Sequence, residues 1–249
     1  YPVAFGRRAQ LNSFLDAIPD FGAGPWEDFF IKAGLQDEIS IHRPFYPRSC
    51  RVRGEATREM LTNALEIEWD QLFRECERET PYRRQASPLF WTLGPKQVGT
   101  ATMLGWQEVI QPIARDVNTG IGLWPFTGTL GEILERQQDV VVETYPGEAY
   151  HHLGFPHPWL GSKRCQLDRL EMSEYFHRWA ATADVEFADS VRAQIDDGSG
   201  EEADGEDPFD ALVGACSMID VVRGVRAPGT HSSADQGIHE GWIFGQSPI

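Results

Sequence analysis

The chain of 249 residues is long enough to bury the core of one domain, or at most two. Its 41% hydrophobic and 11% aromatic content excludes a disordered chain, and its apolar runs are too short to span a bilayer, so we expect no membrane partner. The formal net charge of −16 excludes a broad, non-specific nucleic-acid surface, because phosphate binding depends on Lys and Arg.

The first half of the chain predicts mainly helices and loops. A short helix is expected at residues 25–30, where a proline stands in the first turn, and a long helix at 55–77, where apolar residues recur at helical spacing. Residues 87–99 are punctuated by Pro and Gly and predict a loop or short strand. Residues 101–114 predict a helix with a proline near its end.

Residues 121–126, 130–136 and 140–143 predict a strand, a helix and a strand. This short succession indicates neighbouring strands in a parallel or mixed sheet, and therefore an α/β fold. The run Val140-Val141-Val142 has no polar alternation, as expected for a strand that is covered on both faces.

The remainder of the chain predicts three helices, two loops and a final strand. The helices are expected at residues 163–180, 185–194 and 208–222, the loops at 196–206 and 226–237, and the strand at 242–244. The loop at 196–206 is rich in Gly and acid, and too few residues follow it for a second core, so we expect a mobile surface loop within one domain. The last helix carries a clean apolar stripe that should be buried.

Four cysteines lie far apart, with no C-x-x-C pair; they are Cys50, Cys76, Cys165 and Cys216. This spacing favours reduced, buried thiols in a cytoplasmic protein over a disulfide framework or a zinc site. The opening residues lack the basic flank and the length of a signal peptide, and no initiator Met is present, so we expect an N-terminally incomplete domain.

Residues 43–53 contain four Arg and no acid, with Phe45 and Tyr46 between them. The segment is either a solvated loop or a phosphate-contacting arm with aromatic stacking. Three histidines, at positions 151, 152 and 157, could hold a metal, but their spacing matches no standard zinc motif and favours a surface loop.

The start of the last expected helix carries Asp207, Pro208 and Asp210. Asp as the N-cap, Pro at the first helical position and an acid at the third are all preferred, so capping alone explains the motif. The alternative is a divalent-metal site, because Asp207 and Asp210 lie on one side of the helix. Small residues, among them Gly214, would let this helix approach the sheet closely.

Glu143 ends the Val140–Val142 run. It is either a solvated strand terminus or a ligand at the carboxyl edge of the sheet, where α/β proteins bind their ligands. A helix docked on the sheet could aim Asp207 and Asp210 at this edge. Hard carboxylate oxygens suit Mg²⁺ or Mn²⁺.

Four short blocks occur in an order that resembles a family of uncharacterised proteins described as predicted RNase H-like nucleases. The blocks are Val141–Tyr150, which carries an E-x-Y-P-x-x-A pattern, then Gly161–Arg164 with Arg169, then Asp207–Val213, and finally Glu240–Ile243. The resemblance covers roughly residues 124–244. It implies an RNase H-like mixed five-stranded sheet flanked by helices, with a mostly helical insertion at about 25–120.

The resemblance also implies a two-metal nuclease site. In that superfamily an Asp on the first strand, a Glu on a middle strand and a D-x-x-D pair on the last helix hold two divalent ions. By position these are Glu143, Asp207 and Asp210, as catalytic and metal-ligating residues, and the first-strand Asp has no counterpart in this sequence. One Mg²⁺ or Mn²⁺ would activate water and the other would stabilise the leaving oxygen.

Three cations in the second block are the expected substrate contacts. Lys163, Arg164 and Arg169 would bind a phosphate of a nucleic acid whose type stays open, although Lys163 and Arg164 could equally start a solvated helix. Two other functions remain open. One is a catalytically inactive RNase H-like binding or structural module. The other is hydrolysis of a small phosphorylated substrate, which is more compatible with the strong negative charge than binding of a long duplex.

Overall fold

A computed structural model describes residues 1–49, 56–82, 84–93, 99–116, 118–156 and 161–246. The helices are α1 (Val3–Arg8), α2 (Phe14–Ala17), α3 (Arg58–Leu65), α4 (Gly99–Gly105), α5 (Gln111–Arg115), α6 (Leu130–Glu135), α7 (Pro146–His152), α8 (Gln166–Leu170), α9 (Ser173–Ala183), α10 (Asp189–Asp196), α11 (Glu206–Val222) and α12 (Ala234–His239), and the strands are β1 (Ile121–Leu123) and β2 (Asp139–Val141). No helix in this described part is both long and apolar enough to cross a membrane.

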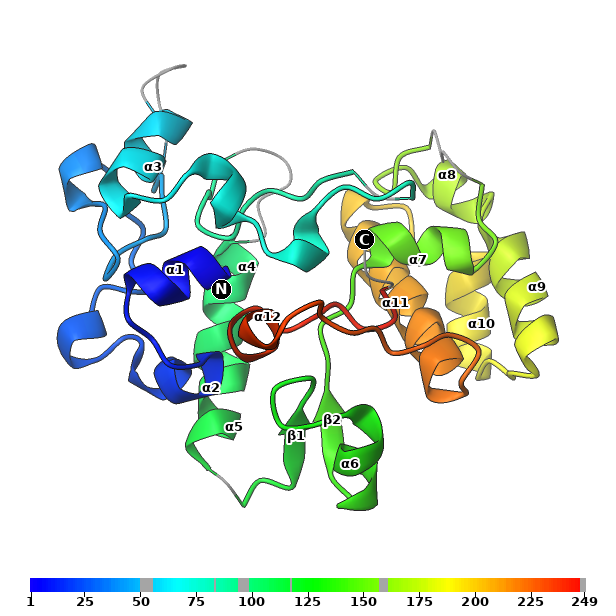
Figure 1. Ribbon diagram of the computed structural model, residues 1–249. Helices are drawn as coiled ribbons and strands as arrows, with labels where there is room; N and C mark the ends of the chain where they lie inside the picture. Colours follow the sequence, from blue (N-terminus) through cyan, green and yellow to red (C-terminus); the bar gives the residue numbers. More distant parts are fainter. Residues whose placement is uncertain (50–55, 83, 94–98, 117, 157–160, 247–249) are drawn as a thin grey trace.

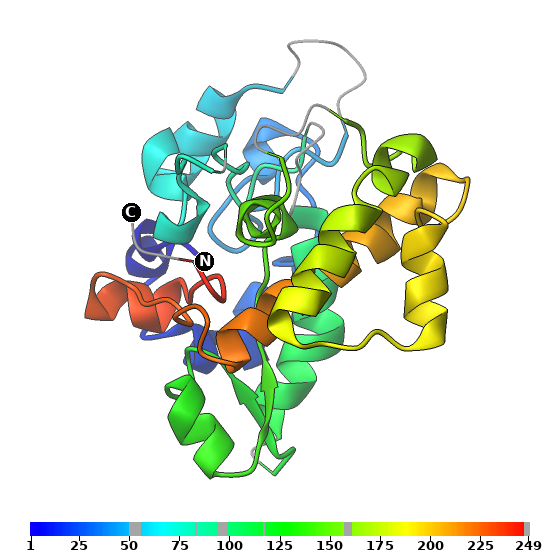
Figure 2. The same ribbon diagram turned by 90° about the vertical axis from the view of Figure 1, so that its right-hand side faces the viewer.

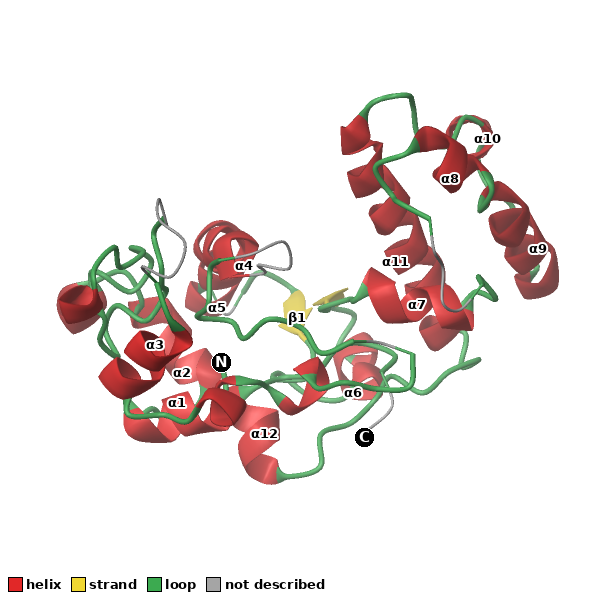
Figure 3. Cartoon of the chain, turned by 90° about the horizontal axis from the view of Figure 1, so that it is seen from above, coloured by secondary structure: helices red, strands yellow, loops and turns green. Residues whose placement is uncertain are grey.

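The elements form three groups (Figure 1). Helices α1 to α5 lie on one side, α7 to α11 lie on the other, and the strands with α6 extend below them; Figure 2 shows the same sheet and α6 below α11. Seen from above, α8 to α11 stand apart from α1 to α5 (Figure 3). Helix α12 returns to the start of the chain, where the amino group of Tyr1 donates to the carbonyl of His239 at 3.2 Å.

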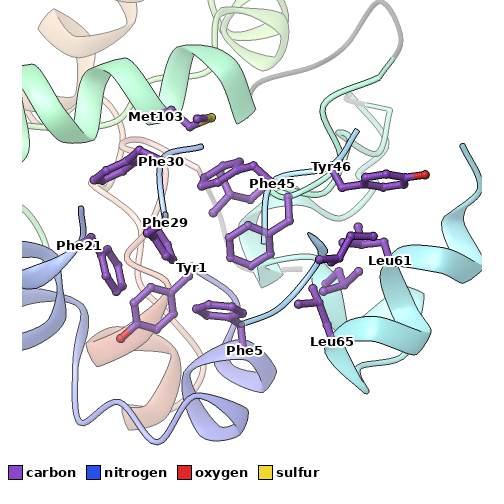
Figure 4. Close-up of a cluster of buried hydrophobic side chains, with 14 of the residues drawn as sticks. Tyr1, Phe5, Phe21, Phe29, Phe30, Phe45, Tyr46, Leu61, Leu65 and Met103 are labelled. Atoms are coloured by element: carbon purple, nitrogen blue, oxygen red, sulfur yellow. The ribbon is translucent and has the colours of Figure 1, made fainter. Parts of the chain in front are cut away.

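The first group is built around buried aromatic rings (Figure 4). We call these rings the N-terminal aromatic cluster; they are Tyr1, Phe5, Phe14, Phe21, Phe29, Phe30, Phe45, Tyr46 and Phe90. Phe21 and Phe29 stack with centroids 3.8 Å apart, and Phe5 meets Phe90 at 4.5 Å. The rings come from the short helices α1 and α2 and from turns and loops, so side-chain packing rather than regular structure holds this region.

The second group is built from amphipathic helices around a C-terminal helical cluster. Its buried residues are Ala149, Leu153, Phe155, Met172, Phe176, Trp179, Ala180, Ile195, Phe209, Val213 and Cys216. The apolar stripe expected on the last helix is confirmed at Phe209, Val213 and Cys216, which are at most 2% exposed, while Leu212 and Ile219 are partly buried against the same cluster. Gly214 also permits a close approach, because a Cβ added there would lie 3.3 Å from Oγ1 of Thr144.

The strand–helix–strand prediction is confirmed. β1 and β2 pair in parallel, with Ile121 opposite Asp139, and α6 lies between them in sequence. Thr129 starts α6 with a capping box, since its hydroxyl accepts from the amide of Glu132 while the Glu132 carboxylate accepts from the amide of Thr129. The molecule therefore combines helices with a parallel sheet, as the α/β expectation requires.

The extent of the sheet differs from the expectation. Among the described residues it has two strands. The segment at 242–244 forms one parallel bridge, between Glu143 and Ile243, instead of a strand. β2 is not covered on both faces, because Asp139 is exposed and Val140 and Val141 are only partly buried.

Two long helices expected from periodicity are broken. The one at 55–77 is described from residue 56; within it α3 ends at Leu65, because Glu66 takes a left-handed conformation at φ 54°, and two 3-10 turns follow. The one at 163–180 is divided into α8 and α9, which turns Met172 into the core at 3% exposure. Periodic apolar spacing survives such breaks, so it did not reveal them.

Other boundaries shift by less. The helix at 25–30 is a 3-10 turn at Gly24–Trp26, and the helix at 185–194 is α10. The helix at 101–114 is confirmed as α4, a π-helical segment and α5, which ends three residues after Pro112. The loop at 226–237 contains the start of α12, where Ser233 and Gln236 form a capping box that the sequence reading missed.

Candidate functional site

Glu143 lies at the carboxyl end of β2, where the sequence predicts it. Its carbonyl accepts from the amide of Phe244 at 2.8 Å, which ties it to the C-terminal segment. Its carboxylate is held by Arg74 through two hydrogen bonds, from Nη1 to Oε2 at 2.7 Å and from Nη2 to Oε1 at 2.6 Å. This bidentate pair is a strong, charge-assisted contact.

Arg74 is the buried partner in this pair. Its side chain is 14% exposed, whereas that of Glu143 is 47% exposed. Its Nε donates to Glu77 at 2.9 Å, and its Nη1 donates to the carbonyl of Glu240 at 3.2 Å. Cys76 lies beside these charges, and burial raises the pKa of its thiol to about 12, so it stays protonated at neutral pH.

Asp210 lies on α11 and also has a cationic partner. Its Oδ2 accepts from Nζ of Lys163, and its Oδ1 accepts from the hydroxyl of Tyr150 at 2.6 Å. Burial first, and then the charge of Asp210, raise the pKa of Tyr150 well above its ordinary value. Tyr150 therefore remains a donor to Asp210.

Asp207 does not cap the last helix, which corrects the capping interpretation. The N-cap is Gly205, and Glu206 and Asp207 are the first two helical residues. The 3-10 turn at Ala203–Gly205 runs directly into α11, so the backbone is already helical where the cap was expected. Asp207 is exposed and contributes only its charge to the helix N-terminus.

The acidic residues lie on adjoining elements but do not form one cluster. Thr144, next to Glu143, packs against Gly214, which is one helical turn after Asp210. In the described residues no three His, Cys, Asp or Glu side chains form a group that could hold a metal. Instead, Glu143 and Asp210 are each neutralised by a cationic side chain.

The three expected substrate contacts have different surroundings. Lys163 is 35% exposed and pairs with Asp210, and Arg164 is exposed. Arg169 is 1% exposed, and its guanidinium donates to four backbone carbonyls; they belong to Lys163, Gly198, Gly200 and Glu202. Arg169 thus fastens the acidic loop at 196–206 with its buried guanidinium, and the phosphate contact expected of it stays a prediction. The mobility expected of that loop stays a prediction.

The aromatic residues of the basic segment at 43–53 are not free to stack on a ligand. Phe45 is 0% exposed and Tyr46 is 2% exposed, because both belong to the N-terminal aromatic cluster. Arg43 donates to the carbonyls of Ile31 and Lys32. The stacking part of the arm hypothesis is therefore wrong, and residues 50–53 of the arm lie outside the described residues.

The thiols and imidazoles follow the sequence expectations in part. Cys76 and Cys216 are buried and free, as predicted, whereas Cys165 is free but exposed, and Cys50 lies outside the described residues. The pKa of His152 is lowered to about 4, first by burial and then by Arg226. Its neighbour His151 stacks on Tyr82 at 3.6 Å. Both histidines belong to α7 and not to the expected surface loop, and His157 lies outside the described residues.

A cavity of about 470 Å³ adjoins Glu143, and the sequence did not predict it. Its wall combines Arg74 with apolar residues of β1, β2, the π-helical segment and the C-terminal segment. No signal in the sequence indicated it, since the run Val140–Val142 predicted a strand that is covered on both faces. The positions that meet there are far apart in sequence, so spacing could not assemble them.

No protein family model, curated protein or solved structure matches this chain. The RNase H-like resemblance therefore stays a prediction that is based on the four blocks alone.

Proposed function

We propose that this chain is a divalent-metal-dependent hydrolase of phosphodiester bonds, with Glu143, Asp207 and Asp210 as ligands of Mg²⁺ or Mn²⁺. One observation carries the proposal: Glu143 and Asp210 lie on adjoining elements, and a cationic side chain neutralises each of them. Each carboxylate is partly exposed and already binds a cationic side chain. At such a carboxylate a divalent ion can replace the ammonium or guanidinium.

The proposed exchange assigns movements to particular side chains. Arg74 is buried and bonded to Glu77, so Glu143, which is half exposed, is the partner that swings away. Lys163 is partly exposed and would leave Asp210, which frees its ammonium for a substrate phosphate. The bound ions would activate water and stabilise the leaving oxygen. Tyr150 keeps its bond to Asp210 and fixes the orientation of that carboxylate.

A second candidate is hydrolysis of a small phosphorylated substrate by the same residues. The net charge of −16 favours it, because a strongly acidic protein repels a long polyanion more than a single phosphate ester. Both candidates place the chemistry at Glu143 and Asp210, so one set of variants serves both.

Titration with Mn²⁺ at constant ionic strength tests the site. A ligand at one hundred times its Kd stabilises the folded state by about 2.7 kcal/mol, so the Tm of the parent should rise. Glu143→Gln and Asp210→Asn should remove most of that rise. Glu135→Gln, an exposed acid on α6, is the control and should respond like the parent.

Cleavage is then assayed with Mn²⁺ on single-stranded DNA, branched DNA, an RNA–DNA hybrid and a small aryl phosphodiester. We expect turnover by the parent and a loss of roughly a hundredfold or more in Glu143→Gln and Asp210→Asn, the scale on which single catalytic groups act. Equal activity in parent and variants would remove these residues from the site. Mn²⁺ binding without cleavage of any substrate would favour the inactive binding module.

A further inference from the structure

The cavity beside Glu143 has no role in the proposed hydrolase. Its volume of about 470 Å³ falls in the range typical of sites for small organic ligands. It lies between α4 with the π-helical segment, the two strands and the C-terminal segment, with β1 and β2 forming part of its wall. A ligand that fills it would replace the covering that the two-stranded sheet lacks.

The wall of the cavity is rich in large aromatic rings. Trp106, Trp124, Phe126 and Trp242 line it, and Trp242 is 2% exposed. Trp124 and Phe126 follow β1, whereas Trp106 begins the π-helical segment. The faces of such rings carry partial negative charge and attract cations, Trp most strongly.

One side of the cavity carries excess negative charge. Glu77, Glu143 and Glu240 line it together with Arg74 and Tyr1, so three carboxylates accompany one guanidinium. Burial lowers the pKa of the Tyr1 amino group to about 5, so this group is uncharged at neutral pH and does not offset the carboxylates. Glu77 and Glu240 are only 3% and 6% exposed. The nearby aliphatic and aromatic wall lowers the local dielectric, which strengthens the field of these charges inside the cavity.

The buried carboxylates keep room for another donor. Glu77 accepts from the amide and from Nε of Arg74, one bond to each oxygen. Glu240 accepts from the amides of Val3 and Glu75, again one bond to each oxygen. A carboxylate oxygen can accept two hydrogen bonds, so both side chains can stay in place and still bind a ligand.

We propose that this cavity binds an organic cation, with an ammonium head group at the carboxylates and an apolar body between the aromatic rings. A cation reduces the excess negative charge, an anion increases it, and a neutral ligand leaves it unchanged. The acidity of the whole chain acts in the same direction, because it draws cations toward the surface. The site needs no divalent metal, so it stands or falls separately from the proposed hydrolase.

Three probes of matched shape test the proposal in the presence of a metal chelator. They are 4-phenylbutyltrimethylammonium, the neutral analogue in which a tert-butyl group replaces the trimethylammonium, and 5-phenylpentanoate. Titration calorimetry and quenching of tryptophan fluorescence would measure their Kd values. We expect the cation to bind at least tenfold more tightly than the neutral analogue, and the anion to bind most weakly.

Gly105 provides the variant that locates the binding site. It lines the cavity in a helical conformation, and a Cβ added there meets no atom within 4 Å. Gly105→Phe and Gly105→Leu should therefore fill part of the cavity and weaken binding of the cation at least tenfold. Gly105→Ala removes the same glycine without filling the cavity, so it should bind the probe like the parent.

Glu143→Gln tests the contribution of charge. Removal of one exposed carboxylate beside the head group should weaken binding of the cation about fivefold and leave binding of the neutral analogue unchanged. Equal affinity for cation and neutral analogue would overturn the proposal, as would a preference for the anion. Unchanged binding in both Gly105→Phe and Gly105→Leu, with Tm values at or above that of the parent, would place the probe elsewhere and also overturn it.

Discussion

The N-terminal aromatic cluster and the C-terminal helical cluster are both well buried, but different features of the sequence build them. In the first, rings such as Phe21 and Phe29 stack across short helices and 3-10 turns. In the second, α7, α9, α10 and α11 each bury one apolar face, and Val213 on α11 is fully buried. A core can thus form where the backbone has little regular structure, provided that large rings supply the buried area.

This difference predicts how each region depends on its side chains. A helix of the length of α11 retains many internal backbone hydrogen bonds when one core residue is lost. The short segments of the N-terminal region have few such bonds, so their order depends on the rings between them. Regular structure and core packing are therefore separable contributions to stability in this molecule.

Phe29→Ala should have the largest effect. The ring is 0% exposed and contacts rings on several segments, among them Phe21 and Phe45. We expect a loss of about 3–5 kcal/mol in the free energy of unfolding, measured with denaturant. Hydrogen exchange should rise mainly over residues 14–46, while α9 and α11 keep their protection.

Phe176→Ala is the matched change in the C-terminal helical cluster. Phe176 is 2% exposed, and its loss should cost a similar free energy but raise exchange mainly in α9 and α11. If each variant raised exchange equally in both regions, the two clusters would form a single cooperative unit, and the distinction drawn between them would fail.

Arg169→Met should have the next largest effect on stability. The substitution keeps an apolar stem in a buried site but leaves four carbonyls without their donor, so we expect a loss of about 3 kcal/mol. Arg164→Met, at an exposed position five residues earlier, should stay within about 0.5 kcal/mol of the parent.

Limited proteolysis of the loop at 196–206 adds a second readout for Arg169→Met. If Arg169 fastens the loop, cleavage there should be slow in the parent and faster in the variant. Rapid cleavage in the parent and an equal rate in the variant would show that the loop is mobile despite these bonds, as its composition alone predicts.

The sequence predicted the elements best where the hydrophobic pattern is clear. Helix α11 is one example, although its expected Asp207 cap was wrong, and the β1–α6–β2 succession is another, although the Thr129 capping box was not part of that prediction. The prediction of one long helix at 55–77 was wrong, because Glu66 adopts a left-handed conformation. Such a conformation is usually marked by a glycine, and none stands at this position. The sequence also did not predict the density of the N-terminal aromatic cluster, because rings on irregular segments have no period.

The sequence predicted the candidate site less well than the fold. It placed Glu143 correctly at the end of a strand, but Arg74 was not identified as its partner, because the two lie 69 positions apart. Arg169 was read as a phosphate contact, although it is buried by the loop that follows it. The sequence does not indicate which charged residues are buried, so their partners can be identified only from the folded structure.

A smaller effect is expected at His152, on the helix that joins the sheet to the C-terminal helical cluster. Its folded pKa of about 4 lies below the ordinary value of 6.5, so the unfolded chain binds a proton first as the pH falls. The folded state should lose stability between pH 6.5 and 4, by about 1 kcal/mol after allowance for partial solvent exposure.

His152→Gln should remove that part of the pH dependence, as measured by denaturant unfolding at several pH values. His151→Gln, at the adjacent position, is the control and should retain most of it, because burial and Arg226 lower the pKa of His152 more than His151 does. An identical pH profile for the parent and His152→Gln would show that the imidazole is solvated and contributes nothing to this difference.

Asp207→Asn should have the smallest effect on stability. Asp207 is the second residue of α11 and does not cap it, so the change removes a favourable interaction with the helix N-terminus, worth about 0.3–1 kcal/mol. It also removes repulsion from Asp210, three positions on, of similar size. The free energy of unfolding should therefore stay within about 0.5 kcal/mol of the parent, while the Mn²⁺ affinity falls if Asp207 is a metal ligand. A loss above roughly 1 kcal/mol would instead indicate a local role that its exposed position does not explain, and unchanged Mn²⁺ affinity in a protein that binds the ion would remove Asp207 from the proposed site.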